Sequence, residues 1–379
     1  MKVLHISGDF IATKVHRNLY KKLDDIDVSQ VIYSPIRDVE LFGSNQFEAN
    51  DTEFIYSYVI KSWYKFIFYY KSHVIFQDVK KKINFEDIDI IHATTLFSDG
   101  VLAYKIHKER NIPYVIAVRN TDINLFSKFL PHTWPIAKKI LLNTERIYFI
   151  SKALQDTFEQ LSFVRPILNK IKNKIVLRPN GIDNQWLDRI DYSCRKGNKI
   201  LYIGNFSPNK NVCRLIESIS LLRKENGYTD MELTIIGGGS DKNNKVTKLI
   251  KSNNHFVKYL GKIYDIPTIR NIMQEHTIFA MPSIYETFGL VYIEALTQNL
   301  PILYTNHQGV DRLFDDNKNP VGIGVNPLSV QDIKNAIKKL LEGNGKYSNK
   351  QVDFSIFNFD IIAKKYKNDY QDIINSKQS

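Results

Sequence analysis

Short apolar runs alternate along the chain with longer stretches of helical hydrophobic spacing. That alternation is typical of β-α-β units, in which helices cover a parallel sheet. In the first half, the runs that we expect to be strands are Lys2–Ser7, Asp89–Ala93, Tyr114–Val118, Arg146–Ile150 and Lys174–Leu177. The expected strands of the second half are Lys199–Ile203, Glu232–Ile236, Ile278–Met281 and Pro301–Tyr304.

Helical spacing is clearest near the end of the chain. Apolar residues recur every three or four positions behind the capping pair Ser329 and Asp332, at Ile333, Ala336, Ile337, Leu340 and Leu341. The same spacing predicts a terminal helix that carries Ile362, Tyr366, Tyr370 and Ile373. Earlier helices are expected over 14–23 and around Ile75, Val79 and Ile83.

Between the two series of strands the pattern pauses at 184–198, a polar stretch that we interpret as a linker. We therefore predict an α/β protein with two doubly wound, Rossmann-like domains, at 1–185 and 198–355, and a helix at 356–379 that packs back on the first domain. In such sheets ligands bind beyond the carboxyl ends of the strands, so candidate chemistry is sought in the turns that follow them.

Composition agrees with a folded protein of ordinary character. Of 379 residues, 43% are hydrophobic and 24% charged, which excludes a disordered chain. The two cysteines, Cys194 and Cys213, exclude a disulfide scaffold and a zinc site built on several thiolates. No apolar run approaches the length that spans a bilayer and the first residues lack a signal-peptide layout, so we expect a cytoplasmic protein.

Charge adds one open question. Lysine and arginine exceed the acidic residues by 12, and a basic surface attracts phosphates in nucleotides, nucleic acids or anionic lipids. Basic residues cluster at 61–82, among aromatic residues, and at 128–178. These clusters are either solvated helix faces over buried aromatic residues or a surface that faces a membrane or another polyanion.

Three of the turns carry candidate ligand groups. Ser7-Gly8-Asp9 follows the first strand but lacks the three glycines of a dinucleotide site, which disfavours hydride chemistry. Lys210 follows a strand that ends at Gly204 and can hold a phosphate. The run Gly237-Gly238-Gly239 allows backbone to approach a ligand closely, or makes a tight turn.

The segment 278–296 carries the sharpest pattern, because an apolar strand leads through a polar turn into a helix. Glu286 is expected in that turn, and the amides of Thr287 to Leu290 at the helix start are a ready site for a pyrophosphate. Glu294 lies two turns further on, where a carboxylate can accept hydrogen bonds from ribose hydroxyls. Alternatively, Glu286 caps the helix and Glu294 pairs with a lysine.

Glu286 and Glu294, separated by seven residues, resemble the E-x7-E signature of the family 4 retaining glycosyltransferases. Other segments resemble that family in the same order: Asn180-Gly181-Ile182-Asp183, Tyr202-Ile203-Gly204 with Lys210, the strand that ends at Gly237-Gly238-Gly239, and Val257-Lys258-Tyr259-Leu260-Gly261. The resemblance is specific over about 175–310 and looser over the first half. It implies the GT-B fold, in which two Rossmann-like domains face a cleft.

The resemblance also implies roles for individual residues. Lys210 neutralises the donor diphosphate, Glu294 holds the ribose and Glu286 contacts the donor sugar. The implied catalytic residues are Glu286, Lys210 and Arg119. The implied donor-binding residues are Gly8, Gly204, Asn205, Lys210, Gly237, Gly239, Lys262, Ile263, Glu286, Thr287, Phe288, Gly289, Leu290 and Glu294. The residues expected to bind the acceptor are Asp9, His92, Asn120 and Asp122.

Two positions depart from the family pattern. Asn205 replaces an expected arginine, which removes a cation, and Arg119 lies where the family has a histidine. No metal or other cofactor is expected: Asp87-Ile88-Asp89 precedes a strand rather than following one. The histidines, among them His92, His107, His132, His255 and His307, lack metal-ligand spacing.

The expected activity is retaining transfer of a sugar from a nucleotide diphosphate sugar to an acceptor hydroxyl. UDP is favoured over GDP as the nucleotide, and the acceptor is a glycan or a lipid-linked sugar of bacterial-type surface assembly, so the protein is expected in the cytoplasm or on the inner face of the membrane. A nucleotide-sugar epimerase of the same fold is the alternative among enzymes. A basic nucleic-acid-binding protein is the alternative outside them, although no recognised nucleic-acid-binding module is present.

Overall fold

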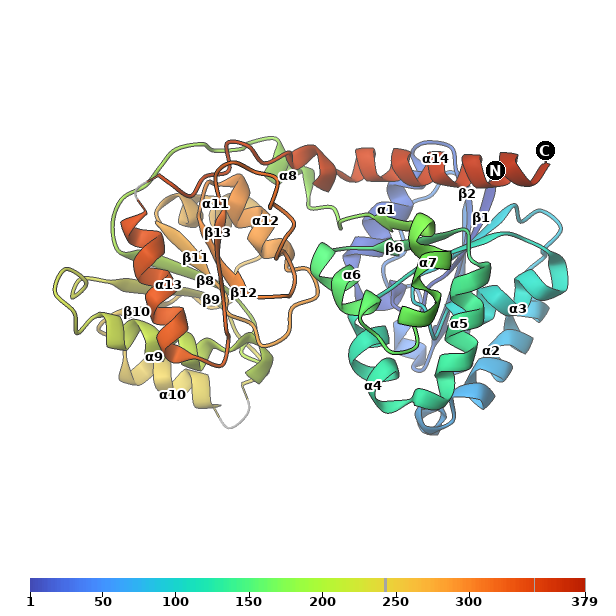
Figure 1. Ribbon diagram of the computed structural model, residues 1–379, viewed down its shortest axis with the longest axis horizontal. Coiled ribbons are helices and arrows are strands. Elements are labelled where there is room, and N and C mark those ends of the chain that lie inside the picture. Colours follow the sequence, from blue (N-terminus) through green and yellow to red (C-terminus); the bar gives the residue numbers. More distant parts are fainter. Residues whose placement is uncertain (242–243, 344, 379) are drawn as a thin grey trace. The chain divides into compact units, whose positions relative to one another are not determined.

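The computed structural model describes residues 1–241, 244–343 and 345–378, which form two compact α/β units (Figure 1). Unit 1 comprises Met1–Ile150, Leu154–Gly181 and the C-terminal segment from Ile356. Unit 2 comprises Ser151–Ala153 and Ile182–Ser355. Each unit is built around one parallel sheet.

Unit 1 contains a seven-stranded sheet in the order β3-β2-β1-β4-β5-β6-β7. Its strands are β1 (Lys2–Ile6), β2 (Ser29–Ile36), β3 (Thr52–Tyr58), β4 (Ile90–Ala93), β5 (Tyr114–Ala117), β6 (Arg146–Phe149) and β7 (Ile175–Leu177). The chain moves outward from β1 in one direction and from β4 in the other. The turns after β1 and β4 therefore meet at the switch point where ligands bind in this architecture.

The helices of this half of the chain are α1 (Lys14–Asp24), α2 (Phe68–Lys82), α3 (Gly100–Arg110), α4 (Ser127–Phe129), α5 (Trp134–Asn143), α6 (Lys152–Glu159) and α7 (Leu168–Ile171). Two strands, β2 and β3, were not anticipated by the hydrophobic pattern. The reason is visible in β2, where buried polar residues interrupt the apolar run. The side-chain NH2 group of the buried Gln30 donates hydrogen bonds there to the Tyr20 carbonyl and the Thr52 hydroxyl, both at 2.9 Å.

The terminal helix α14 (Phe359–Gln378) belongs to unit 1 and lies beside α1 (Figure 1). Its apolar face joins the same core cluster as β1 and β4 through Phe359, Ile362, Ala363, Tyr366, Tyr370 and Ile373. An ion pair of 2.8 Å between Arg178 and Asp369 adds a polar tie. The i, i+3, i+4 spacing of its apolar residues presents one continuous stripe, and this stripe packs against unit 1.

Unit 2 contains a six-stranded sheet in the order β10-β9-β8-β11-β12-β13. Its strands are β8 (Lys199–Gly204), β9 (Glu232–Gly237), β10 (Val257–Tyr259), β11 (Ile278–Ala280), β12 (Ile302–Thr305) and β13 (Gly322–Val325). Its helices are α8 (Asn184–Leu187), α9 (Val212–Leu222), α10 (Lys245–Ser252), α11 (Ile266–Gln274), α12 (Leu290–Thr297) and α13 (Val330–Glu342). The switch point lies between β8 and β11, so the loops that follow these two strands meet there.

The start of α13 agrees with its sequence signature, since the Ser329 hydroxyl accepts a hydrogen bond from the Asp332 amide. The stretch 184–198, in contrast, is not a free linker. It belongs to unit 2, where α8 buries Trp186 and the Arg195 guanidinium bonds the Gln298 carbonyl and Asp191. The expected boundary at 185 is therefore corrected to Gly181, because polar residues in this stretch bind the second unit rather than solvent.

Candidate functional site

In unit 2 the loops after β8 and β11 are tied to each other by Asn209. Its carbonyl accepts from the Ile284 amide at 2.7 Å, and its side chain exchanges hydrogen bonds with the backbone of Tyr285 at 2.8 and 2.9 Å. The Asn211 side-chain amide donates to the Pro282 carbonyl at 2.9 Å. These contacts hold two loops that are distant in sequence in one rigid arrangement.

Lys210 and Glu286 meet across this junction. The Lys210 Nζ lies 2.6 Å from the Glu286 Oε2, and the two side chains are 21% and 11% exposed. The Glu286 backbone amide donates to Gln308 Oε1 at 2.6 Å, which fixes the turn that carries the carboxylate. The structure therefore brings together the two residues that the sequence assigns to the donor diphosphate and the donor sugar.

Helix α12 begins immediately after this turn. Gly289 precedes it with φ of +77°, and an added Cβ would lie 2.4 Å from the Tyr292 ring, so the position requires glycine. The N-cap position of α12 is occupied by Gly289, three residues after Glu286, which removes the alternative that Glu286 is the N-cap residue. Phe288 is buried, so only its backbone can contact a ligand, whereas Thr287 and Leu290 are half-buried.

Glu294 lies within α12 and is half-buried. Burial, and secondarily the negative charge of Asp183, raises the pKa of its carboxyl to about 7. Of the described residues, none forms an ion pair with it, so the alternative of a lysine partner finds no support. A half-buried carboxyl without a cation is well suited to accept hydrogen bonds from vicinal hydroxyls.

A glycine turn lies beside these loops at the end of β9. Gly237 pairs with Gly204 in the sheet, and a Cβ on Gly237 would lie 1.8 Å from the Gly204 carbonyl oxygen. The Tyr259 hydroxyl donates to the Gly237 carbonyl at 3.1 Å. A Cβ on Gly239 would lie 3.6 Å from the Nζ of the exposed Lys262, so this cation lies over the turn, with the half-buried Ile263 next in the chain.

Asn205, which replaces the family arginine, folds back on its own loop. Its side-chain oxygen accepts from the Ser207 amide at 3.0 Å, and its carbonyl accepts from the Tyr202 hydroxyl at 2.9 Å. It therefore shapes the turn and supplies no charge.

In unit 1 the turn after β1 lies over a buried acid that the sequence analysis missed. A Cβ on Gly8 would lie 3.5 Å from Asp99 Oδ1, and the hydroxyls of Thr94 and Thr95 donate to Asp99 Oδ2 at 2.8 and 3.0 Å. Burial, and then the charge of the exposed Asp9, raises the pKa of Asp99 to about 7. Its place in the turn after β4, before α3, was the available signal.

Arg119 follows β5, and its Nε donates to the Thr94 carbonyl at 3.2 Å. It lines a narrow hollow of about 10 Å³ in unit 1 together with His16, Arg178, Asn180 and Tyr366. Burial, and then the positive charge of Arg119, holds the pKa of His16 well below its ordinary value. Arg119 therefore lines this narrow hollow next to a neutral imidazole.

Two residues expected to bind the acceptor are instead part of the core. His92 is 2% exposed under α14 and forms a 2.7 Å hydrogen bond with the Tyr370 hydroxyl. The carboxylate of the buried Asp122 accepts from the backbone amides of Leu96, Phe97 and Arg119, at 3.1, 3.1 and 2.8 Å. Asp122 therefore positions the Arg119 loop. Asn120, by contrast, is half-buried and bonded to Asn124.

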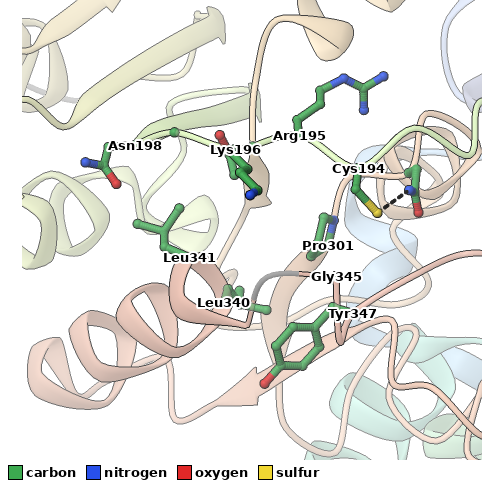
Figure 2. A pocket seen from close by; sticks show the side chains of 12 residues that line it. Cys194, Arg195, Lys196, Asn198, Pro301, Leu340, Leu341, Gly345 and Tyr347 are labelled. Carbon is green, nitrogen blue, oxygen red and sulfur yellow. Dashed lines mark hydrogen bonds between the residues drawn. The ribbon is translucent and has the colours of Figure 1, made fainter.

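A larger hollow, of about 200 Å³, lies elsewhere in unit 2 (Figure 2). Part of its lining directly precedes β8, β11 and β12 in the chain, at Lys196, Thr277 and Pro301, and the rest includes the end of α13. It is therefore at the amino ends of the strands. The Asn299 side-chain amide donates a hydrogen bond of 3.9 Å to the Cys194 Sγ (Figure 2). Because parallel sheets bind ligands at the opposite edge, this hollow is not the candidate site.

Nowhere in 1–241, 244–343 and 345–378 do three or more histidine, cysteine, aspartate or glutamate side chains group as metal ligands. Within the same ranges no helix combines the length and the apolar character needed to cross a bilayer.

The two Rossmann-like units, with a paired lysine and glutamate, a glycine turn and a half-buried acid after the strands of the second, define a glycosyltransferase of the GT-B type. The chain belongs to the group 1 glycosyltransferases. Residues 187–355 match the family described as glycosyl transferases group 1, and residues 18–186 match the one described as glycosyltransferase family 4.

Relatives with curated names agree with this assignment. An uncharacterized glycosyltransferase, MJ1178, of Methanocaldococcus jannaschii is 23% identical over 69% of this chain and 68% of its own length. The alpha-monoglucosyldiacylglycerol synthase of Acholeplasma laidlawii is 23% identical over 76% of each chain.

Solved structures show the same fold. Sucrose-phosphate synthase from Thermosynechococcus elongatus superposes with a TM-score of 0.73 at 16% identity, over 99% of this chain and 100% of that one. HepE from Anabaena, solved in complex with UDP-glucose, superposes with a TM-score of 0.63 at 16% identity, over 97% and 98% of the two chains.

Proposed function

We propose that this glycosyltransferase moves a sugar, with retention of anomeric configuration, from a nucleotide diphosphate sugar to an acceptor hydroxyl. The observation that carries the proposal is the 2.6 Å pair of Lys210 and Glu286 at the head of α12, with Glu294 further along the same helix. UDP is the favoured nucleotide, and a solved relative of the same fold holds UDP-glucose.

In the proposed complex the donor lies on unit 2. The Glu294 carboxylate accepts hydrogen bonds from the ribose hydroxyls, and the base lies beside Lys262 and Ile263. The diphosphate lies at the start of α12, where the first amides of a helix have no partner within it. Gly237 and Gly239 have no side chains, so the backbone of their turn can approach the donor closely.

Catalysis in this proposal is mainly electrostatic. As the bond between the sugar and the diphosphate breaks, negative charge grows on the leaving oxygen and the sugar becomes cationic. Lys210 and the α12 amides stabilise the first charge, and Glu286 stabilises the second through the sugar hydroxyls. The existing ion pair holds both groups in place beforehand, which lowers the cost of organising them during the reaction.

Unit 1 supplies the acceptor side. Arg119 faces a hollow of that unit, and the Gly8 turn with Asp9 lies above the buried Asp99. No separate base is needed in this scheme, because the leaving phosphate oxygen takes the acceptor proton on the same face of the sugar. Arg119 adds positive charge for a phosphate of the donor or of the acceptor.

Because Lys210 and helix amides provide the positive charge, we expect turnover without a divalent cation. An assay in excess EDTA tests this expectation. Loss of activity that added Mg²⁺ or Mn²⁺ restores would contradict it.

The acceptor that we propose is a glycan or lipid-linked sugar of surface glycan or glycolipid assembly, at the cytoplasmic face of a membrane. The A. laidlawii relative is named for synthesis of a glycolipid. Thermal-shift screening of UDP, GDP and ADP and their sugars identifies the donor, since saturating ligand at about 100 times its dissociation constant stabilises by about 2.7 kcal/mol. NMR of the product then reports the anomeric configuration.

The same assay separates the two alternatives. A nucleotide-sugar epimerase converts the donor with no second substrate, whereas a transferase requires an acceptor. A salt-dependent gel shift with DNA or RNA tests for the nucleic-acid-binding protein. Conversion of the donor alone, or tight nucleic-acid binding with no donor-induced stabilisation, would contradict the proposal.

A further inference from the structure

Two segments of unit 1 combine aromatic residues with lysines and contain no acid. Neither 54–77 nor 123–144 contains an aspartate or glutamate. The first contains Lys61, Lys65 and Lys71, and the second contains Lys128, Lys138 and Lys139. A long basic stretch without acids is unusual for a helix face that only needs to be soluble, where both signs are normally interspersed.

The structure brings the two segments together. The Tyr69 hydroxyl donates to the His132 carbonyl at 2.9 Å, and the Phe68 and Phe126 rings lie 5.8 Å apart. Within the first segment, Trp63 stacks on Tyr70 at 5.6 Å. The start of α2 and the short helix α4 lie at the same end of unit 1 (Figure 1). One surface therefore comes from both segments.

Large apolar side chains are exposed on this surface. Phe129 is 71% exposed and Trp63 is 47% exposed, and four others are close to half exposed: Ile67, Tyr69, Tyr70 and Leu125. We refer to these six residues as the aromatic patch. Such a group of exposed apolar side chains on a protein surface marks an interaction site, and tryptophan and tyrosine favour the boundary between lipid headgroups and acyl chains.

The charge around the patch is available to a partner. Lys61, Lys128 and Lys139 are exposed, and none of the three forms an ion pair with a described residue. Two lysines at the other end of α2 differ: Lys80 pairs with Glu109 at 2.8 Å and Lys82 with Asp78 at 3.4 Å. The basic cluster at 61–82 therefore contains lysines with internal partners as well as Lys61, which is open to a partner.

We propose that the aromatic patch with Lys61, Lys128 and Lys139 is a docking surface for an anionic lipid bilayer. The aromatic rings enter the headgroup region and the lysines bind lipid phosphates, in the manner of interfacial segments that combine an apolar face with basic residues. The docking deepens the proposed use of a lipid-linked acceptor, but it stands on the surface itself and does not require that the proposed activity is correct.

Vesicle sedimentation of the full chain tests the docking surface, with phosphatidylcholine alone or mixed with phosphatidylglycerol. We expect salt-sensitive binding to the mixed vesicles only. The aromatic variant W63S/Y70S/F129S and the charge variant K61E/K128E/K139E each weaken binding at least about tenfold. Matched controls change equally exposed residues of unit 2, as Y192S/L221S/Y264S and K251E/K258E/K318E, and retain it.

Tryptophan fluorescence adds a readout of insertion. Of the other two tryptophans, Trp186 is buried and Trp134 is half-buried, so the part of a blue shift on adding mixed vesicles that disappears in Trp63→Phe reports entry of Trp63 into lipid. Absent binding at low salt, or binding that both patch variants retain, would overturn the proposal. Self-association that the aromatic variant abolishes, without vesicle binding, would assign the patch to a second copy and overturn it too. Sedimentation uses no sugar donor, so its failure leaves donor-induced stabilisation, the test of the proposed function, untouched.

Discussion

The ammonium group of Lys210 lies 2.6 Å from a carboxylate oxygen of Glu286, although 76 positions separate the two residues in the chain. The two side chains are only 21% and 11% exposed, so salt screens their attraction less than that of an ordinary surface ion pair. The contact holds a cation and an acid at the start of α12 before any ligand arrives.

Lys210→Met is expected to lower kcat by about 100-fold or more, because an oriented cation that stabilises a leaving group has an effect of this size. Glu286→Ala is expected to remove most turnover, with a smaller effect on donor affinity. Steady-state kinetics check both, with the exposed Lys258→Met as the matched control. The double variant should lose little more than the worse single variant, since the two residues act as a unit. Full activity in either single variant would refute the assignment.

Glu294 gives a dependence on pH. Its folded-state pKa of about 7 lies above the ordinary value, so burial of the ionised form destabilises the free enzyme progressively as pH rises from about 4.5 to 7. Glu294→Gln should therefore be more stable than the wild type above pH 7, by an amount of the order of 2 kcal/mol, and nearly equal to it at pH 4.5. Urea unfolding at the two pH values measures the difference.

The same carboxylate must accept hydrogen bonds from the ribose. UDP-glucose has no phosphate group that titrates near pH 7, so its affinity for the wild type is expected to rise as pH increases through about 7, and this rise should be absent in Glu294→Gln, which binds more weakly at neutral pH. Calorimetric titration across that range checks it. A pH profile that is unchanged by the substitution would show that Glu294 does not hold the nucleotide.

Gly237 and Gly227 form a matched pair, because both have positive φ, at +133° and +88°. A Cβ on Gly237 would lie 1.8 Å from the Gly204 carbonyl oxygen, whereas one on Gly227 has nothing within 4 Å. Gly227→Ala should cost about 1 kcal/mol for backbone strain alone. Gly237→Ala should cost more than about 3 kcal/mol, since the β8–β9 pairing must open. Thermal unfolding separates them, and equal losses would argue against this close approach.

His92 and Arg119 test the corrected view of unit 1. His92→Phe should leave kcat and the acceptor KM close to those of the wild type, and should lower stability by about 1–3 kcal/mol because the Tyr370 hydroxyl loses its buried partner. Arg119→Met should leave stability nearly unchanged and lower kcat/KM. Acceptor kinetics and thermal unfolding of both variants measure these effects. A specific loss of acceptor binding in His92→Phe would restore its original assignment.

The local pattern determined most of the strands and helices of this protein. Runs such as 278–281 are apolar enough to predict strands that are buried on both faces. The Ser329 cap and the apolar stripe that follows it predict a helix at α13. The strand β2 escaped this reasoning, because burial of Gln30 depends on partners from α1 and β3 that accept hydrogen bonds from its side-chain NH2 group. Those partners are not neighbours in sequence.

The candidate site divides in the same way. The spacing of Glu286 and Glu294 in a strand-turn-helix segment marks them as a unit from sequence alone, and Lys210 follows a strand in a way that suggests a ligand. Only the tertiary structure pairs Lys210 with Glu286, places Asp99 under Gly8 and buries His92 beneath α14. The sequence specifies which residues lie at strand ends. The contacts between strand ends depend on the spatial order of the strands in each sheet, and so does the desolvation that raises the pKa of Asp99 and Glu294.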